Sequence, residues 1–339
     1  MRIGLIGCGA VTTWCHLPAL RRIPGVTVTA VADPDDASRS RAAHVARAAP
    51  YKSAEVLLSS SDVDAVIVAV PTSMHASIGS MAARAGKSFY LEKPIATGFD
   101  DARLLRAAFD AASVRAAVGF NRRYHPLYER ARSIVAEGQL GRIHAVQTAF
   151  CEPVPPTGLP RWKELRQTGG GVLLDLGSHH IDLIRWILGS EVVEVNASAR
   201  SDSSEQDSAT MSMILDDGCE VQSFVSFRAG YADRIELIGE QGSISIDRHR
   251  GSLKLQSPRR LGYGTRRRFV TPSLNDAGWR ARRLIKPAED PSYYRALRAF
   301  TSATAADLAS LADGERSLEV VLAAEESAMR GTPVSVTRI

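Results

Sequence analysis

An acid and an imidazole stand one helical turn apart in the apolar stretch of residues 169–188. Asp175, His179 and Asp182 fall at positions i, i+4 and i+7, so a helix would place them on one face. Most other positions are Leu, Ile or Trp, which predicts a buried helix. Ionisable groups on such a helix must be paired or must line a cavity. A cavity lined by a carboxylate and an imidazole favours proton transfer.

Two other interpretations of this polar stripe stay open. Asp175 and His179 could form a buried pair that only satisfies its own hydrogen bonds. A metal site needs a third ligand, and Asp-x-x-x-His supplies two, so we predict no metal. His180 lies about 100° around the helix from His179, which indicates packing or support of the site residues from behind.

The first residues predict a dinucleotide-binding unit. An apolar strand over residues 3–6 is followed by a turn with Gly7 and Gly9, and a second strand over residues 26–32 ends in Asp33. Gly7 permits the tight turn, and Gly9 lets backbone approach a pyrophosphate at the next helix N-terminus. Asp33 can accept both ribose hydroxyls and would repel a 2′-phosphate, so NAD is favoured over NADP. The alternative is a plain structural turn.

This glycine fingerprint is incomplete, because Thr12 stands where a third glycine is usual. That position governs how closely the helix packs on the strand and makes no phosphate contact. We therefore expect a slightly wider spacing between helix and strand, with binding retained.

More strand–helix units follow. Residues 63–70 form a near-continuous apolar run, typical of a strand covered on both faces, and end in the loop 71–75. A strand over residues 88–91 runs into Glu92-Lys93-Pro94, and another covers 115–120. This alternation predicts an α/β fold with a doubly wound parallel sheet that binds ligands at its carboxyl edge. The predicted cofactor contacts are Gly7, Gly9, Ala10, Val11, Asp33, Pro71, Thr72, His75, Glu92 and Lys93.

Lys93 has two interpretations. It follows a strand and precedes a proline that fixes the local backbone, as a surface lysine at a turn would. Its place at the predicted cofactor edge equally suits an ammonium that donates to the reacting oxygen of a substrate.

A chain of 339 residues predicts two domains, and the pattern changes at residue 121. We therefore predict a cofactor domain over 1–120 and a substrate-binding and oligomerisation domain over 121–339. In the second, alternating runs joined by tight Gly and Asp turns predict an antiparallel meander. An open sheet of this size often hides one face in an oligomer. The alternating runs cover residues 192–199, 209–215, 220–227, 234–238, 243–247 and 253–256.

Residues 258–286 are rich in arginine. One interpretation is a solvated loop. The other is a binding segment for a phosphorylated substrate or a nucleotide sugar, because the paired N–H donors of an arginine guanidinium match phosphate oxygens.

Composition bears on which partners and which cellular compartment the sequence predicts. The net charge of +5 is modest for this length, and no nucleic-acid-binding motif accompanies it, so we predict no nucleic-acid partner. The four cysteines form no Cys-x-x-Cys pair, which indicates a reducing compartment. A strand-like start leaves no room for a secretory signal, and no apolar run reaches membrane-spanning length. We expect a cytoplasmic protein with no membrane partner.

Taken together, these motifs resemble the glucose–fructose oxidoreductase/inositol dehydrogenase (Gfo/Idh/MocA) family over nearly the whole chain. The marks are Gly7-x-Gly9, Glu92-Lys93-Pro94, residues 119–123, and Gly169-Gly170-Gly171 leading into Asp175-x-Gly177-x-His179-x-x-Asp182. The resemblance implies a Rossmann domain and a C-terminal α+β domain with a large, mostly antiparallel open sheet. It also implies a homodimer or homotetramer assembled through that sheet, and a Lys93–Pro94 bond that is often cis.

The resemblance further implies hydride transfer between NAD and a carbinol or ketone carbon of a sugar, nucleotide sugar or cyclitol. His179 would accept the hydroxyl proton, Asp175 would stabilise the imidazolium or hold one substrate hydroxyl, and Lys93 would donate to the reacting oxygen. The alternatives are a redox-neutral, NAD-dependent enzyme that cleaves glycosides or epimerises sugars, and a non-catalytic dinucleotide sensor. The expected substrate contacts are Lys93, Asn121, Arg122, Trp162, Asp175 and His179.

Overall fold

The computed structural model describes residues 1–59, 62–256, 290–302 and 308–336, so the arginine-rich stretch 258–286 lies outside the described residues. The chain folds into two compact units. Unit 1 comprises Met1–Asn121, Gln167–Gly169 and Ser292–Leu318. Unit 2 comprises Arg122–Arg166, Gly170–Pro291 and Glu319–Ile339. That unit 1 serves as a cofactor domain and unit 2 as a substrate-binding and oligomerisation domain stays a prediction.

A six-stranded parallel sheet in the order β3-β2-β1-β4-β5-β6 forms the centre of unit 1. Strand β1 pairs with both β2 and β4, so the winding direction reverses there, and the predicted doubly wound sheet is confirmed. The short strand β3 has no counterpart in the sequence analysis. The strands are β1 (Arg2–Ile6), β2 (Thr27–Ala32), β3 (Ala49–Tyr51), β4 (Ala65–Val68), β5 (Ser88–Leu91) and β6 (Ala116–Val118).

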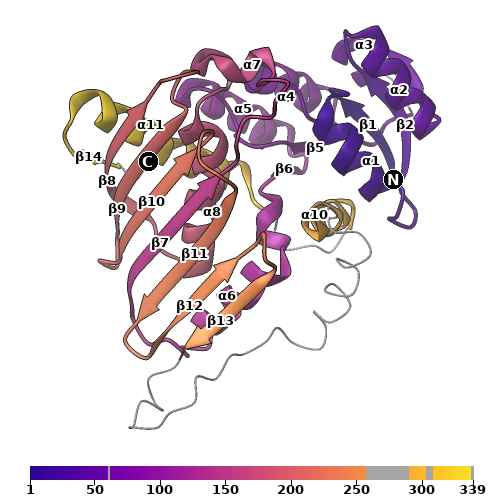
Figure 1. The fold of residues 1–339 in the computed structure, drawn as a ribbon. Coiled ribbons are helices and arrows are strands. Elements are labelled where there is room, and N and C mark those ends of the chain that lie inside the picture. Colours follow the sequence, from indigo (N-terminus) through magenta and orange to yellow (C-terminus); the bar gives the residue numbers. More distant parts are fainter. Residues whose placement is uncertain (60–61, 257–289, 303–307, 337–339) are drawn as a thin grey trace. The chain divides into compact units, whose positions relative to one another are not determined.

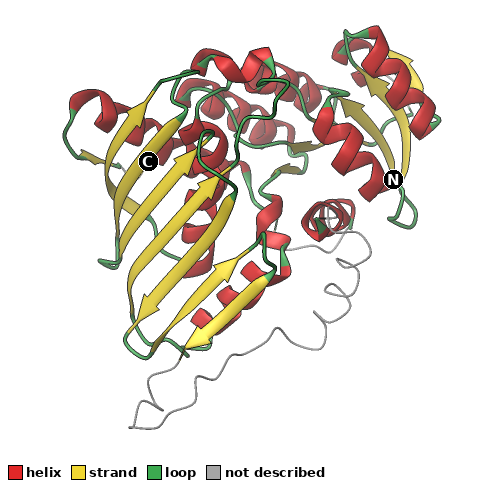
Figure 2. Cartoon of the chain, viewed as in Figure 1, coloured by secondary structure: helices red, strands yellow, loops and turns green. Residues whose placement is uncertain are grey.

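Helices flank this sheet (Figures 1 and 2). The first one begins at Ala10 and contains a π-helical turn over Thr12–His16, a rare conformation that often marks functional sites. The other helical segments are α1 (Leu17–Leu20), α2 (Asp36–Ala46), α3 (Ala54–Leu58), the 3₁₀ turn Thr72–Met74, α4 (His75–Arg84), α5 (Phe99–Ala112), α10 (Pro291–Thr301) and the start of α11 (Leu311–Arg330).

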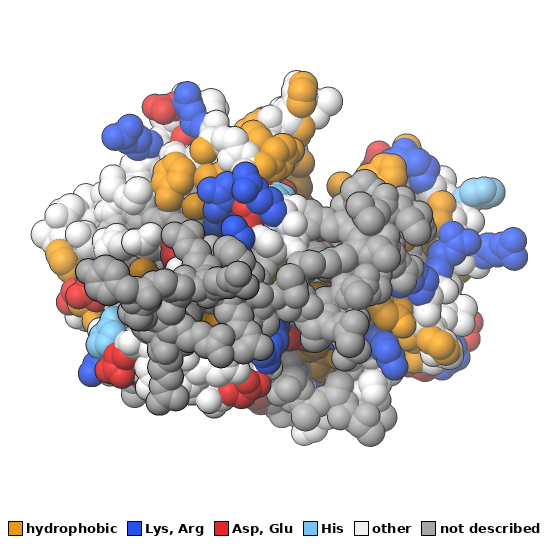
Figure 3. Space-filling model, turned by 60° about the horizontal axis from the view of Figure 1, so that its bottom comes forward, with side chains coloured by type: hydrophobic (Ala, Val, Ile, Leu, Met, Phe, Trp, Pro, Cys, Tyr) orange, Lys and Arg blue, Asp and Glu red, His pale blue; other side chains and the backbone are white. Residues whose placement is uncertain are grey.

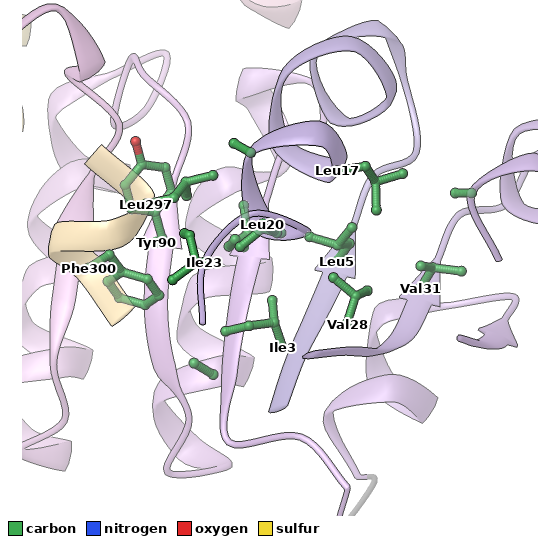
Figure 4. Packing of buried hydrophobic residues seen from close by; sticks show 14 of the residues in the cluster. Ile3, Leu5, Leu17, Leu20, Ile23, Val28, Val31, Tyr90, Leu297 and Phe300 are labelled. Atoms are coloured by element: carbon green, nitrogen blue, oxygen red, sulfur yellow. The ribbon is translucent and has the colours of Figure 1, made fainter. Parts of the chain in front are cut away.

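The core of unit 1 explains why a late segment of the chain joins it. Side chains of β1 and β2 pack with Leu20 of α1 and with Leu297 and Phe300 of α10 (Figure 4). The centre of the Phe300 ring lies 5.4 Å from the centre of the Tyr90 ring on β5. Because burying one such side chain is worth about 1.5–3 kcal/mol, α10 contributes substantially to the stability of unit 1.

Unit 2 contains an eight-stranded sheet in the order β13-β12-β11-β7-β10-β9-β8-β14. Strand β7 lies between β10, to which it is parallel, and β11, to which it is antiparallel. The predicted simple meander is therefore wrong at this point. The strands are β7 (Ile143–Cys151), β8 (Val192–Arg200), β9 (Ser208–Leu215), β10 (Glu220–Ser226), β11 (Ala232–Gly239), β12 (Gly242–Asp247), β13 (Ser252–Gln256) and β14 (Val334–Ser335).

The connection between β10 and β11 explains this difference. Residues 227–231 join the two strands, and this loop is long enough to cross about 10 Å, twice the usual spacing of neighbouring strands. A two-residue turn would instead have forced β10 and β11 to pair directly. The rest of the sheet is mostly antiparallel, so the predicted C-terminal α+β domain is confirmed.

The two faces of this sheet differ. Helices α6 (Pro126–Ala136) and α8 (Ser178–Leu188) lie behind the sheet in Figure 1. Residues that point to the other face are exposed at alternate positions of β9 and β10. They include Ile214 and Phe224, which are 40% and 37% exposed.

The described part of the surface in Figure 3 carries hydrophobic side chains among lysine, arginine, aspartate and glutamate side chains. Such a mixture is ordinary for protein surfaces that face water. Among the described helices, none combines the length and apolar character that crossing a bilayer requires.

Candidate active site

The glycine turn after β1 has the shape that a dinucleotide requires. Gly7 has a φ of +92°, and a Cβ there would lie 2.2 Å from the carbonyl oxygen of Ala69, so a larger residue does not fit. Gly9 is exposed, and a Cβ built on it would meet no atom within 4 Å. The space above the turn is thus open at the position where a pyrophosphate would approach the helix N-terminus.

Asp33 lies beside this turn, directly after β2. Its Oδ2 atom accepts a 2.7 Å hydrogen bond from the amide of Cys8, and its Oδ1 atom accepts one of 2.8 Å from the amide of Asp35. The carboxylate is half-buried. These bonds fix the carboxylate next to Gly9, where a ribose would lie.

Ala10 and Val11 begin the helix, Ala10 exposed and Val11 half-buried. The hydroxyl of the buried Thr12 donates a 2.6 Å hydrogen bond to the carbonyl oxygen of Gly7. The Thr12 side chain therefore ties the π-helical turn to the glycine turn, which a glycine at this position could not do.

The same π-helical turn ends at His16, which reaches the Glu92-Lys93-Pro94 turn. Nε2 of His16 lies 2.8 Å from Oε1 of Glu92, and the imidazole is fully buried. Lys93 is half-buried, and the Lys93–Pro94 bond is cis, as the resemblance implies. His16 was not among the residues predicted from sequence, and its imidazole contacts the Glu92-Lys93-Pro94 turn through Glu92.

His75 holds the other side of that turn. Its Nδ1 lies 2.8 Å from the carbonyl oxygen of Pro94, and its Nε2 lies 3.1 Å from that of Val70. Burial lowers the pKa of His75 below its ordinary value, although both carbonyl contacts act in the opposite direction. Because both ring nitrogens face backbone carbonyls, His75 helps to hold the turn in place. Its predicted contact with the cofactor stays a prediction.

The loop before α4 completes the carboxyl edge of the sheet. Pro71 is half-buried and precedes the 3₁₀ turn Thr72–Met74. Thr72 is buried within unit 1. Their predicted cofactor contacts stay predictions.

The predicted catalytic residues divide between the two units, with Lys93 in unit 1 and Asp175 and His179 in unit 2. In unit 2, a π-helical turn over Leu173–Gly177 carries Asp175 and continues into α8, which carries His179. Because a π-turn is wider than an α-turn, the simple i, i+4, i+7 face predicted for this segment does not hold in detail.

Asp175 is paired with a lysine from the preceding loop. Nζ of Lys163, on the one-turn helix α7 (Arg161–Glu164), lies 2.6 Å from Oδ2 of Asp175. The same ammonium lies 5.4 Å from the ring centre of Trp162, which is half-buried. Trp162 was predicted from sequence as a substrate contact, whereas Lys163 was not.

Asp182 has a separate partner. Nε of Arg123 donates a 2.9 Å hydrogen bond to Oδ2 of Asp182, and both side chains are buried. Asp182 thus holds α8 in place, while Asp175 has the more accessible partner Lys163.

The imidazole of His179 is half-buried and meets an aromatic ring. Its ring centre lies 6.0 Å from that of Phe150 on β7, in an edge-on arrangement. The neighbouring His180 stacks on the same ring at 5.2 Å, and the Arg122 guanidinium lies 3.9 Å from its centre. Phe150 therefore fixes the surroundings of the predicted base.

One buried carboxylate, Asp233 on β11, organises this region. It accepts hydrogen bonds from Arg122, from Tyr128 at 2.7 Å and from Arg248 at 2.5 Å, and lies 3.2 Å from Nε2 of His180. We call these five residues the Asp233 network. Burial alone would raise the pKa of Asp233, but the two guanidiniums and His180 hold it well below its ordinary value. Burial lowers the pKa of His180.

Two predicted substrate contacts have structural partners. Arg122 is buried and ion-paired within the Asp233 network. Nδ2 of the buried Asn121 donates a 2.8 Å hydrogen bond to the hydroxyl of Ser292, at the start of α10. Their contact with substrate stays a prediction.

Comparison with known proteins decides the family. A family model described as "Oxidoreductase family, NAD-binding Rossmann fold" matches residues 1–120, and one for the GFO/IDH/MocA C-terminal domain matches residues 128–245. An inositol 2-dehydrogenase of Saccharopolyspora erythraea is 32% identical over 258 residues, which cover 73% of each chain. The chain belongs to the GFO/IDH/MocA family. It is an NAD-dependent oxidoreductase, as the sequence analysis predicted.

Two further GFO/IDH/MocA comparisons agree with this membership. A dTDP-3,4-didehydro-2,6-dideoxy-alpha-D-glucose 3-reductase of Streptomyces violaceoruber is 31% identical over 269 residues, covering 76% of this chain and 78% of that protein. The crystal structure of an oxidoreductase domain protein from Kribbella flavida superposes with a TM-score of 0.87 over 99% of both chains. At 24% identity, that structure supports the fold alone.

Proposed function

We propose that this enzyme transfers a hydride between NAD and a carbinol or ketone carbon of a cyclitol, a sugar or a nucleotide sugar. The observation that carries the proposal is that a buried Asp175 and a half-buried His179 lie four residues apart in one continuous helical stretch, Leu173–Gly177 and α8. Relatives named as an inositol 2-dehydrogenase and a dTDP-sugar 3-reductase support this range of substrates.

We propose three roles for the chain's own residues. His179 accepts the proton of the reacting hydroxyl, and returns it in the reverse direction. Lys93 donates a hydrogen bond to the reacting oxygen, which stabilises an alkoxide or polarises a ketone. Asp175 stabilises the positive charge on His179 or holds a neighbouring substrate hydroxyl. Bound NAD supplies the hydride acceptor at its nicotinamide ring.

The experiment is a turnover assay of the purified enzyme with NAD and a panel of cyclitols, sugars and nucleotide sugars. We expect the release of NADH in proportion to the oxidised product for at least one substrate class. Turnover without any net NADH would favour the redox-neutral alternative. NAD binding without turnover of any substrate would favour the sensor.

Asp33 is expected to set the preference for NAD. Asp33→Asn keeps one acceptor oxygen for the turn but removes the charge. We expect NAD affinity to fall about 10- to 100-fold, because hydrogen bonds to charged groups are worth about 1.5–3 kcal/mol, and NADP affinity to rise. Titration calorimetry measures both, with Asp110→Asn on the exposed side of α5 as the control. An unchanged ratio of the two affinities would remove Asp33 from cofactor selection.

We propose a homodimer or homotetramer that forms through the exposed face of the unit 2 sheet. Ile214 and Phe224 lie on that face, since Ile214 pairs with Glu220 and Thr210 pairs with Phe224 across β9 and β10. Large exposed apolar side chains on an open sheet are typical of an interface.

Phe224→Glu is expected to shift the enzyme toward monomers, because a charge cannot be buried without a partner. Light scattering after size-exclusion chromatography measures the mass. Tyr231→Glu is the control, because Tyr231 is exposed in the loop between β10 and β11. A wild-type monomer, or an oligomer that survives Phe224→Glu, contradicts assembly through this face.

We also propose that the enzyme works in the cytoplasm. None of its four cysteines is in a disulfide, and Cys8, Cys151 and Cys219 are buried. A set of cysteines without disulfides, most of them buried, suits a reducing compartment.

A further inference from the structure

The loop that carries Lys163 is fixed at several points of unit 2. The amide of Lys163 donates a 2.7 Å hydrogen bond to the carbonyl oxygen of Pro160, and the amide of Arg166 donates one of 2.5 Å to Glu205. The Arg166 guanidinium is also ion-paired with Glu325. These contacts therefore fix the backbone that carries the Lys163 side chain.

The middle glycine of the Gly169-Gly170-Gly171 motif is explained by this loop. A Cβ on Gly170 would lie 2.2 Å from the carbonyl oxygen of Lys163 and 2.9 Å from that of Leu165. The amide of Gly170 donates a 3.0 Å hydrogen bond to Leu165. The loop can approach the π-helical turn only because residue 170 has no side chain. The missing side chain at Gly170 thus lets this loop bring Lys163 against Asp175.

The buried Asp175 carboxylate needs a positive partner, and the Lys163 ammonium supplies it. Asp175 is only 7% exposed, and a buried carboxylate needs compensation by a positive charge or hydrogen bonds. Lys163 lies 2.6 Å away and is itself only a quarter exposed, so bulk water screens the pair weakly.

We propose that Lys163 is a positioning residue that holds the Asp175 carboxylate ionised and in one orientation for catalysis. It acts through Asp175 and does not itself touch the reacting atoms. This proposal rests on the proposed function, in which Asp175 supports His179 or a substrate hydroxyl.

The test compares Lys163→Met, Lys163→Arg and the control Lys254→Met. Methionine retains most of the lysine stem beside Trp162 but lacks the charge, and Lys254 lies at an exposed position of β13. For Lys163→Met we expect the acid limb of the kcat/KM profile, which protonation of His179 sets in the proposed function, to move up by about one pH unit. The Asp175 carboxylate, no longer neutralised by the ammonium, then favours the protonated imidazole more strongly. We also expect kcat to fall about tenfold or more through misplacement of the carboxylate. Lys163→Arg should restore most of both.

NAD affinity should stay unchanged in all three variants, because the glycine turn and Asp33 belong to unit 1. An unmoved acid limb in Lys163→Met, or a loss of kcat that arginine does not restore, would show that Lys163 has a structural role only. A loss of folding in Lys163→Met, detected by circular dichroism, would contradict the proposal too, since it makes the pair a stability element.

A second measurement needs no substrate. In protein labelled with ¹³C at aspartate carboxyls, with Asp175→Asn for assignment, the Asp175 signal should titrate at higher pH in Lys163→Met than in wild type. Equal titration midpoints of Asp175 in Lys163→Met and in wild type would overturn the proposal. If wild type turns over no substrate while the midpoints differ, the proposed function fails and the charge pairing stands.

Discussion

His179→Ala is expected to lower kcat about 10²- to 10⁴-fold, the usual contribution of a general base. His179 is half-buried on α8, with its ring held edge-on against Phe150, so water should not replace it efficiently. NAD affinity is expected to stay nearly intact, because the glycine turn and Asp33 lie in the other unit. Steady-state kinetics and titration calorimetry with NAD measure the two quantities.

His144→Ala is the matched control for this variant. His144 is an exposed imidazole on β7 of the same unit, 3.5 Å from the exposed Glu240. Its loss should leave kcat unchanged. Wild-type turnover in His179→Ala would remove His179 from the mechanism, and a matching loss in His144→Ala would indicate a general effect on folding.

Asp233→Ala is expected to destabilise the protein by about 3–5 kcal/mol, the usual result of removing one partner from a buried ion pair. The substitution removes the carboxylate with which both Arg122 and Arg248 are paired, while Arg248 keeps its second ion pair, with Asp290. It also removes the partner of Tyr128. Urea unfolding followed by circular dichroism measures the change.

Glu240→Ala supplies the comparison, since its pair with His144 is exposed and exposed pairs are worth about 0–1 kcal/mol. Equal stability of Asp233→Ala and wild type would contradict the importance given to the network. The pH dependence gives a second readout. Because the pKa of Asp233 is depressed in the folded state, its contribution is present above about pH 4 and is lost as the pH falls through the folded value. Asp233→Ala should lack this loss.

Local signals in the sequence were sufficient to predict much of the fold. The strand over residues 88–91 was predicted with the bounds that β5 has, because its apolar run and the following proline are both local. The glycine turn and Asp33 could be paired because a strand, a turn and a second strand set their spacing. Period-2 alternation marked most strands of unit 2.

Contacts between distant residues could not be predicted in this way. Asp233 meets Arg122 across 111 positions of sequence, and no spacing rule links them. The packing of Phe300 on Tyr90 and the insertion of β7 between β10 and β11 likewise depend on tertiary structure. Lys163 was missed because loop lysines are usually solvated, and only the approach of its backbone to Gly170 separates it from them.

Transfer of deuterium tests the proposed chemistry most directly. The enzyme would be given NAD and a substrate from the panel that carries deuterium on its carbinol carbon, and the released NADH would be analysed by mass spectrometry. We predict one deuterium in each NADH and an equal amount of ketone product. Product that forms without deuterium in released NADH would contradict hydride transfer to a freely exchanging cofactor.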